Sequence, residues 1–327
     1  PAALAGDPDV DVVVELIGGS DGPARVLVEA ERRWGFAPGI EITLEANPTD
    51  AEAGRFAALA QAGVNRLSMG VQALDDASLR FLGRNHSAGE AIRAVETARR
   101  AFPRLSIDLI YARPEQTVEG WTAELIQALA LGFEHVSPYQ LTVEPETAFG
   151  RALRRGALIP PDEDQAAALY EATQAVLSAA GFEAYEVSNH ARGLAARSAH
   201  NLHVWRGDDY LGLGPGAHGR LTLEGLRTAT VAHRRIGDYV AGVLAGAPWA
   251  EREAMDTAGE AEERALLGLR TVEGVLLEQL APLGLRAGEG AVAGLTADGF
   301  LRVEGGRLVA TQRGRPVLDG VLKALLT

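Results

Sequence analysis

The 327 residues contain 47% hydrophobic and 23% charged residues, an ordinary globular balance, and suffice for one large domain and a small one. The net charge of −13 argues against a general nucleic-acid binder, and the lack of cysteine excludes disulfides, thiolate metal sites and cysteine nucleophiles from these residues. No apolar run reaches the roughly 18 residues of a membrane span and no signal peptide is evident, so a cytoplasmic location is expected.

In chain order, short β-branched runs alternate with segments of helical periodicity up to Thr142. The predicted strands are Val10–Ile17, Ile40–Ala46, Arg66–Val71, Leu105–Ala112 and Glu134–Thr142. The predicted helices are Pro23–Arg33, Asp50–Ala62 with Asp50 as its cap, Asp75–Leu82, Ser87–Phe102 and Val118–Leu131. This alternation indicates βαβ units and a parallel sheet. A doubly wound sheet also fits, but polar residues end several strands, which favours a (β/α) barrel.

The second half of the chain predicts a different organisation. A helix is expected over Asp162–Ala180, a strand over Glu183–Ser188, and a loop rich in glycine, histidine and aromatic residues over Ser198–Gly219. The last predicted elements are the helices Gly259–Leu269, Leu276–Leu283 and Gly288–Asp298 and the strands Phe300–Glu304 and Arg307–Thr311. Helices followed by a tight hairpin predict a small winged-helix-like C-terminal domain.

Polar residues stand on or at the ends of the predicted parallel strands. They are Glu45, Gln72, Asp108 and Tyr139, and Arg84 follows the second of these strands. Asp108 interrupts an apolar run, and a charged residue there is costly unless it is paired or bound to a ligand. Since parallel strands end at one rim, we expect these side chains to converge on a shared site.

The segment from His200 to Trp205 combines two imidazoles with an indole. Such a set suits a flat aromatic ligand or an axial metal ligand, although a loop anchored by Trp205 explains it equally well. It makes a poor zinc site because it offers no thiolate. The glycine-rich run Gly212–Arg220 lacks the lysine and hydroxyl residue of a phosphate-binding loop.

Taken together, Ile40–Gly219 resembles the radical S-adenosylmethionine proteins of the oxygen-independent coproporphyrinogen III oxidase group, and most of all the heme chaperones among them. The motifs that carry the resemblance are EITLEANP, RLSMGVQ followed by LGR, DLIYARPEQT, SPYQLTVEPET, YEVSNHAR, HNxxxW and GPGAHGR. The C-terminal part is similar to the small C-terminal domain of the same group. The resemblance runs from about residue 31 to the end and implies a partial parallel barrel of radical SAM type.

The resemblance also implies cofactors and site residues. S-adenosylmethionine is expected at Glu45, Gln72, Arg84, Asp108 and Thr142. The heme signature maps to His200, Asn201 and Trp205, with His200 as the expected iron ligand and Val204 where the group has tyrosine. No catalytic residue is assigned.

The first thirty residues depart from the group. Its members begin with a strand that carries three cysteines, which hold a [4Fe–4S] cluster, and these ligands are missing here. Residues 7–30 instead resemble a strand and helix of homoserine dehydrogenase. We therefore expect a barrel without its first strand and a junction near residue 30, left by a fusion, an assembly artefact or a misplaced start. The expected domains are 1–30, 31–250 and 251–327.

The function implied is that of a heme chaperone-like protein, which binds heme and S-adenosylmethionine and hands heme to a membrane-associated acceptor protein, without cluster-dependent chemistry. The alternative is a radical enzyme of porphyrin biosynthesis that oxidises coproporphyrinogen III. Two other classes are a barrel hydrolase or aldolase with Asp108 or Glu45 as general base, and a dehydrogenase suggested by the first thirty residues alone. No nucleic-acid partner is expected.

Overall fold

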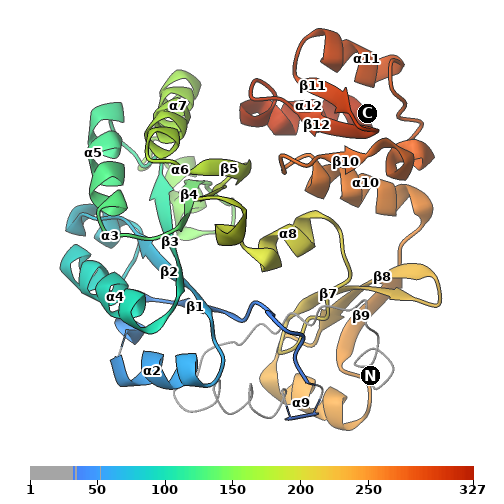
Figure 1. The fold of residues 1–327 in the computed structure, drawn as a ribbon. Helices are drawn as coiled ribbons and strands as arrows, with labels where there is room; N and C mark the ends of the chain where they lie inside the picture. Colours follow the sequence, from blue (N-terminus) through green and yellow to red (C-terminus); the bar gives the residue numbers. More distant parts are fainter. Residues whose placement is uncertain (1–31, 34, 52) are drawn as a thin grey trace. The chain divides into compact units, whose positions relative to one another are not determined.

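The computed structural model describes residues 32–327 except 34 and 52, and the chain divides into two compact units (Figure 1). One unit is Thr43–Arg197, and the other joins the described residues before Thr43 with Ser198–Thr327. The strand and most of the helix expected before residue 34 lie outside the described residues. So does the proposed junction near residue 30.

The unit Thr43–Arg197 is built on a six-stranded sheet in the order β1-β2-β3-β4-β6-β5. Its strands are β1 (Thr43–Ala46), β2 (Arg66–Gln72), β3 (Arg104–Tyr111), β4 (His135–Gln140), β5 (Glu183–Glu186) and β6 (Asn189–Ala191). The first four run parallel, and the β5–β6 hairpin joins β4 in antiparallel fashion. The predicted α/β fold with a parallel sheet is confirmed.

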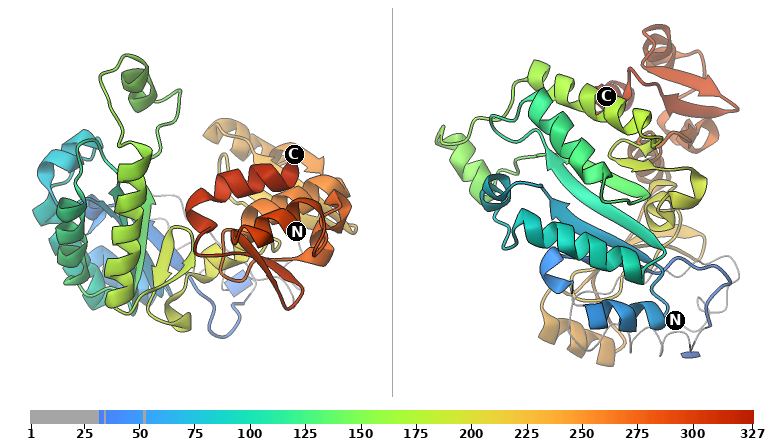
Figure 2. Two further views of the ribbon diagram at one scale, coloured as in Figure 1. Left: turned by 90° about the horizontal axis from the view of Figure 1, so that it is seen from above. Right: turned by 60° about the vertical axis from the view of Figure 1, so that its left-hand side comes forward.

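Helices connect the strands of this sheet. They are α2 (Ala53–Gln61), α3 (Asp76–Phe81), α4 (Ala88–Ala101), α5 (Val118–Leu129), α6 (Ala148–Arg154) and α7 (Glu163–Ala179). Figure 2 shows α4, α5 and α7 side by side along one face of the sheet. Several of these helices begin at a capping side chain. The Ser87 hydroxyl, for example, accepts a hydrogen bond from the Glu90 amide at 3.2 Å, an amide in the first turn of α4 that has no partner within the helix.

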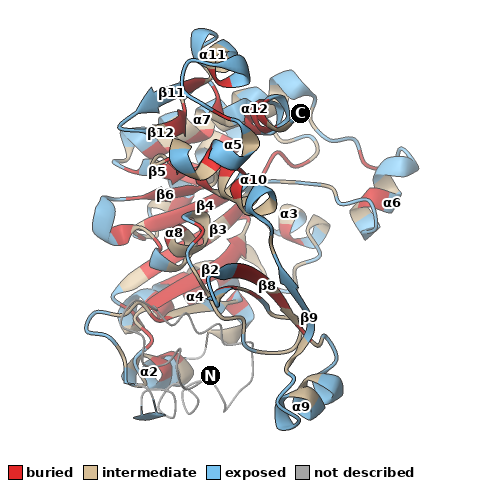
Figure 3. Cartoon of the chain, turned by 90° about the vertical axis from the view of Figure 1, so that its right-hand side faces the viewer, coloured by how far each residue is buried: buried red, intermediate tan, exposed pale blue. Residues whose placement is uncertain are grey.

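The face of the sheet under these helices is apolar. Alternate residues of β2 and β3, such as Leu67, Met69 and Ile107, are fully buried, as the red strands of Figure 3 show. At the far end of β3, Tyr111 stacks on Trp121 of α5 with ring centroids 5.4 Å apart. The Trp121 indole N–H donates to Thr173 Oγ1 of α7 at 2.7 Å, so α5 and α7 are joined by a buried hydrogen bond.

The second unit contains two three-stranded antiparallel sheets. Its elements are α8 (Ala199–Trp205), β7 (His218–Leu223), β8 (Leu226–Ala232), α9 (Ile236–Leu244), β9 (Trp249–Ala254), α10 (Thr257–Gly268), β10 (Val275–Leu276), the 3₁₀ helix η4 (Leu277–Leu283), α11 (Gly290–Ala297), β11 (Leu301–Glu304), β12 (Arg307–Ala310) and α12 (Leu318–Leu326). The β11–β12 hairpin turns at Gly305 and Gly306, both with positive φ, as the Gly-Gly pair predicts.

Four local predictions are corrected by the structure. Asp50 does not cap α2; its carboxylate accepts from the Asn47 amide at 3.3 Å within a short 3₁₀ turn, Pro48–Asp50. The strand expected over Glu183–Ser188 is the β5–β6 hairpin, and Leu276–Leu283 is mainly a 3₁₀ helix that contains Pro282. The expected loop after Ser198 begins instead with helix α8, whose first amides are capped by Ser198 and by the distant Glu41.

Candidate functional site

The face of the sheet opposite the helices carries polar side chains. Register places Glu45 beside Ser68 and Asp108 beside Ser137, and side chains at such paired positions share one face. Ser68 Oγ donates to Asp108 Oδ1 at 3.3 Å. Polar residues from β1, β2, β3 and β4 are therefore gathered on one surface, as the strand-end pattern predicted for Glu45 and Asp108.

Asp108 is the electrostatic centre of this polar face. Burial raises the pKa of its carboxyl to about 6. The Glu45 carboxylate acts in the same direction, while hydrogen bonds from Ser137 and Ser68 and the charge of Arg66 oppose it. Glu45 thus lies close enough to Asp108 to disfavour its ionised form, and carboxyl groups with a pKa perturbed in this way cluster at functional sites.

A chain of hydrogen bonds leads from Ser137 to the hairpin. Ser137 Oγ donates to Asn189 Oδ1 at 3.1 Å, and Asn189 Nδ2 donates to Glu186 Oε2 at 2.6 Å. Tyr139 lies near this group: burial raises the pKa of its phenol to about 12, and the charges of Asp108, Glu186 and Glu45 add to that rise. The phenol therefore remains a neutral donor at physiological pH.

Gln72 ends β2 in an unusual conformation, with φ at +68°. This left-handed geometry is costly for a residue with a Cβ and is found at functional sites. Gln72 Nε2 lies 2.7 Å from the position that a Cβ on Gly70 would occupy, and Asn47 Oδ1 lies 3.8 Å from it. Since Gly70 follows Ser68 by two residues, the Gln72 amide lies over the polar face, where glycine leaves it room.

Arg84 and Thr142 complete the set of five predicted S-adenosylmethionine contacts. Arg84 Nε is buried and finds no hydrogen-bond partner among the described residues. A buried guanidinium donor without a partner is expensive, so it invites an acceptor from a ligand. Thr142 is exposed just beyond β4, with its hydroxyl 3.4 Å from the Gln140 carbonyl. No contact given by the structure brings either residue to Asp108.

A buried histidine of the same face was missed from the sequence. His135 Nδ1 bonds with Ser106 Oγ and its Nε2 with the Tyr185 hydroxyl, both at 2.7 Å. Burial and the nearby Arg66 hold the pKa of His135 well below its usual value, so the imidazole is neutral. The signal for this face was present in the sequence as the alternation of polar residues in RLSMG, RLSID and HVSP.

The heme-signature residues lie on helix α8, in the other unit. His200 and Asn201 occupy its first turn, where the His200 amide is bound by Glu41 at 3.1 Å. Trp205 ends the helix beneath the Arg270 guanidinium, whose carbon lies 4.6 Å from the ring centroid. The Trp205 indole N–H is buried and has no acceptor among the described residues.

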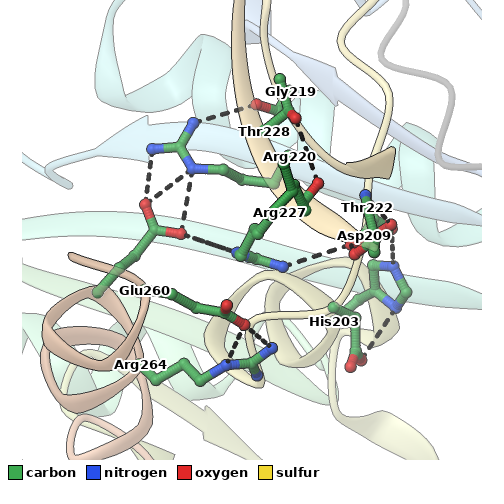
Figure 4. A network of polar contacts seen from close by, with 12 residues as sticks. His203, Asp209, Gly219, Arg220, Thr222, Arg227, Thr228, Glu260 and Arg264 are labelled. Atoms are coloured by element: carbon green, nitrogen blue, oxygen red, sulfur yellow. Dashed lines mark hydrogen bonds and ion pairs between the residues drawn. The ribbon is translucent and has the colours of Figure 1, made fainter. Parts of the chain in front are cut away.

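Next to α8, a polar network ties β7 and β8 to α10 (Figure 4). Arg227 is buried, and its guanidinium bridges Asp209 and Glu263 at 3.3 Å each. Glu263 also binds Arg220 at 2.7 Å. His203, one turn from His200, bonds through Nε2 to the Asp209 carbonyl at 2.7 Å, so its imidazole is engaged within the protein.

Comparison with known proteins identifies the family. The radical SAM superfamily model matches residues 5–126, and the HemN C-terminal domain model matches residues 258–317. The heme chaperone HemW of Mycobacterium tuberculosis is 39% identical over 95% of this chain and 78% of its own length. The chain belongs to the HemW family of radical SAM proteins. HemW of Bacillus subtilis is 34% identical, over 88% of this chain and 76% of its own.

Other relatives extend this picture. The mouse radical S-adenosyl methionine domain-containing protein 1, mitochondrial, is 40% identical over 88% of this chain and 67% of its own length. Coproporphyrinogen III oxidase (HemN) from Escherichia coli superimposes with a TM-score of 0.73, covering 93% of this chain and 74% of that chain at 20% identity, which shows a shared fold.

The N-terminal boundary remains a prediction. The radical SAM match begins at residue 5 and so includes residues 7–30, for which the sequence analysis predicted a resemblance to homoserine dehydrogenase. The boundaries expected at residues 30 and 250 are tested by none of these comparisons.

The side chains available as ligands fit one of the implied cofactors and not the other. S-adenosylmethionine is compatible with the polar face, which offers the carboxyl groups of Glu45 and Asp108 and the Gln72 amide over Gly70. The buried Arg84 Nε, without a partner among the described residues, is a further donor. A [4Fe–4S] cluster does not fit: the 327 residues hold no cysteine, and the described part of the chain contains no group of three or more His, Asp or Glu placed to bind a metal. No described helix is long and apolar enough to cross a membrane.

Proposed function

We propose that this protein is a heme chaperone, which binds heme and S-adenosylmethionine and passes heme to an acceptor protein. Membership of the HemW family, whose curated bacterial members are named heme chaperones, is the observation that carries the proposal. A cytoplasmic location and an acceptor held at a membrane belong to the same proposal.

S-adenosylmethionine is assigned to the polar face of the sheet in Thr43–Arg197. Glu45, Gln72, Arg84, Asp108 and Thr142 are the residues proposed to hold it. The Glu45 carboxylate suits a ribose diol or an amine, and Arg84 suits the ligand's carboxylate. In the radical SAM family this cofactor supplies a carbon radical when a reduced cluster cleaves it. The present proposal contains no cluster-dependent step, because these residues offer no ligands for a cluster.

Heme is assigned to helix α8. His200 is the proposed axial ligand, and the Trp205 indole, with its partnerless buried N–H, offers an aromatic surface and a donor. Arg270, over the Trp205 ring, adds positive charge that suits the propionates of heme.

Heme titration followed by Soret absorbance tests this assignment. We expect wild-type protein to shift the Soret band with saturation, and His200→Ala to abolish or strongly weaken the shift. His218→Ala is the matched control, since this exposed histidine lies in the same unit on β7. Identical spectra for wild type and His200→Ala would remove His200 as the ligand, and no shift with wild type would remove the chaperone proposal.

Calorimetric titration with S-adenosylmethionine tests the other ligand. Arg84→Met should weaken binding about 10- to 100-fold, the value of hydrogen bonds to a charged group. Arg80→Met, at an exposed position four residues earlier, is the control and should bind like wild type. Anaerobic loss of coproporphyrinogen III in the presence of protein and reductant would instead favour the alternative, a radical oxidase.

A further inference from the structure

The amide of Gln72 lies on a different face of the sheet from the one that strand pairing alone predicts. Gln72 is paired with Leu109, and a bulge interrupts the register of β2 and β3 between Met69 and Gln72. Leu109 is fully buried on the apolar face, where a side chain at the paired position of a regular strand would also lie. The Gln72 amide instead lies against Gly70, over the polar face, because the bulge and the left-handed backbone redirect it.

Hydrogen bonds on both sides of Gln72 hold this backbone in place. On one side, His86 Nε2 lies 3.2 Å from the Val71 carbonyl oxygen, and since a carbonyl only accepts, the imidazole donates. On the other side, the Leu74 amide donates to Glu124 Oε1 of α5 at 2.8 Å. A residue with a Cβ keeps a left-handed backbone only where its surroundings fix it, and these two contacts do so.

The Glu124 carboxylate also holds the chain that follows β3. Its side chain is 10% exposed, and Arg113, whose side chain is 6% exposed, donates to both of its oxygens. The Gln116 side-chain amide donates to Oε2 at 3.5 Å. An ionised carboxylate can accept all of these bonds, because its two oxygens offer about four acceptor sites. One carboxylate therefore fixes the segments that follow two neighbouring strands.

Left-handed backbone is concentrated around this carboxylate. In the part of the chain that the structure describes, the residues other than glycine with a positive φ are Gln72, Ala112, Glu115 and Glu224. All of these except Glu224 lie within two residues of a group that donates to Glu124. Such costly conformations cluster at functional sites, where the surrounding structure maintains them.

We propose that Glu124 is a positioning residue: its carboxylate fixes the left-handed end of β2 and so directs the Gln72 amide onto the polar face. The inference rests on the proposed function for the identity of the ligand, S-adenosylmethionine. The amide then offers that ligand a donor and an acceptor in a fixed place before it binds, so less conformational entropy is lost on binding.

Two double variants isolate the oxygen that accepts from the Leu74 amide. Arg113→Met/Glu124→Gln and Arg113→Met/Glu124→Met both replace the ion pair by uncharged side chains, an exchange that buried ion pairs often tolerate. Only the glutamine variant retains an oxygen for Leu74. The ¹³Cα and ¹³Cβ chemical shifts of Gln72, measured by NMR on the ligand-free full chain, report its backbone conformation.

We expect left-handed shifts for Gln72 in wild type and in the glutamine variant, and extended shifts in the methionine variant. Glu119→Gln, at an exposed position in the first turn of α5, is the control and should match wild type. The same conformation in both double variants, or an extended Gln72 in wild type, would overturn the proposal. If the methionine variant does not fold, hydrogen exchange of the Leu74 amide in wild type decides: exchange about 100-fold slower than in an unstructured peptide supports the contact, and faster exchange rejects it.

Calorimetry with S-adenosylmethionine connects the turn to the ligand. The methionine variant should bind about 5- to 10-fold more weakly than the glutamine variant, the value of one hydrogen bond. With Gln72→Ala added to both, the difference should disappear, because Glu124 then has no amide to position. A difference that persists would mean that Glu124 acts by another route, against the proposal. If wild type does not bind S-adenosylmethionine while the NMR shifts behave as expected, the role of Glu124 in the turn stands and the proposed ligand is rejected.

Discussion

The replacement Asp108→Asn should make the protein more stable at neutral pH, although it removes a predicted ligand contact. Burial and the neighbouring Glu45 raise the Asp108 pKa from 3.8 to about 6. A carboxyl group with a raised pKa stabilises the folded state below its unfolded pKa, near pH 3.8. That stabilisation is lost as the pH rises through 6, because the folded protein must then hold a poorly solvated charge.

The magnitude follows from the size of the shift. A rise of about two pH units, at about 1.4 kcal/mol for each unit, gives about 3 kcal/mol at pH 8. The asparagine side chain stays neutral at every pH. The stability of Asp108→Asn relative to wild type should therefore increase by about 2.5 kcal/mol between pH 4 and pH 8, because part of the penalty is already present at pH 4.

Urea unfolding at a series of pH values measures this difference. Fluorescence of Trp121, which is fully buried in the same unit, reports the transition. Asp164→Asn, at an exposed position in the first turn of α7, is the control and should follow wild type within about 0.5 kcal/mol. A constant difference between Asp108→Asn and wild type from pH 4 to pH 8 would refute the reasoning, since it would mean that folding does not perturb this carboxyl.

Three further changes test other parts of the structure. Thr173→Val should cost about 1–3 kcal/mol of unfolding free energy, because the buried Trp121 N–H loses its acceptor; urea unfolding measures it. Glu263→Ala should cost about 3–5 kcal/mol, since it leaves buried Arg227 with a single carboxylate partner; a drop below 1 kcal/mol in thermal unfolding would contradict this. Gly70→Ala places a methyl group against the amide that ends β2 and should weaken S-adenosylmethionine binding by at least tenfold in calorimetry, with the circular dichroism spectrum retained.

The local sequence pattern was enough to predict the parallel sheet. Each strand from β1 to β4 was foreseen within a few residues, because apolar runs bounded by glycine, proline and capping residues are local signals. Ser87 and Asp162 start α4 and α7 by bonding amides three residues along the chain, so their effect is visible in the sequence itself.

Helix α8 shows where local pattern fails. The segment from Ser198 was predicted to be a loop because it is rich in glycine and aromatic residues. It begins instead with a helix, whose first amides donate hydrogen bonds to Glu41. Glu41 lies more than 150 residues earlier in the chain, and no sequence rule links the two. The hairpin at Glu183–Ala191 was missed for a related reason. Whether such a short segment forms a strand depends on the neighbouring strand with which it pairs.

The sequence by itself determined the family, the alternation of strands and helices, and the polar residues that end the strands. Each of these follows from short motifs and from the periodicity of neighbouring residues. Only the tertiary structure decided that Glu45 and Asp108 share one face, that the Gln72 amide folds over Gly70, and that Ser137, Asn189 and Glu186 are joined by hydrogen bonds. Most of these contacts join strands that are distant in the chain, and the position of the Gln72 amide depends on the left-handed backbone with which β2 ends, so local residue order does not predict them.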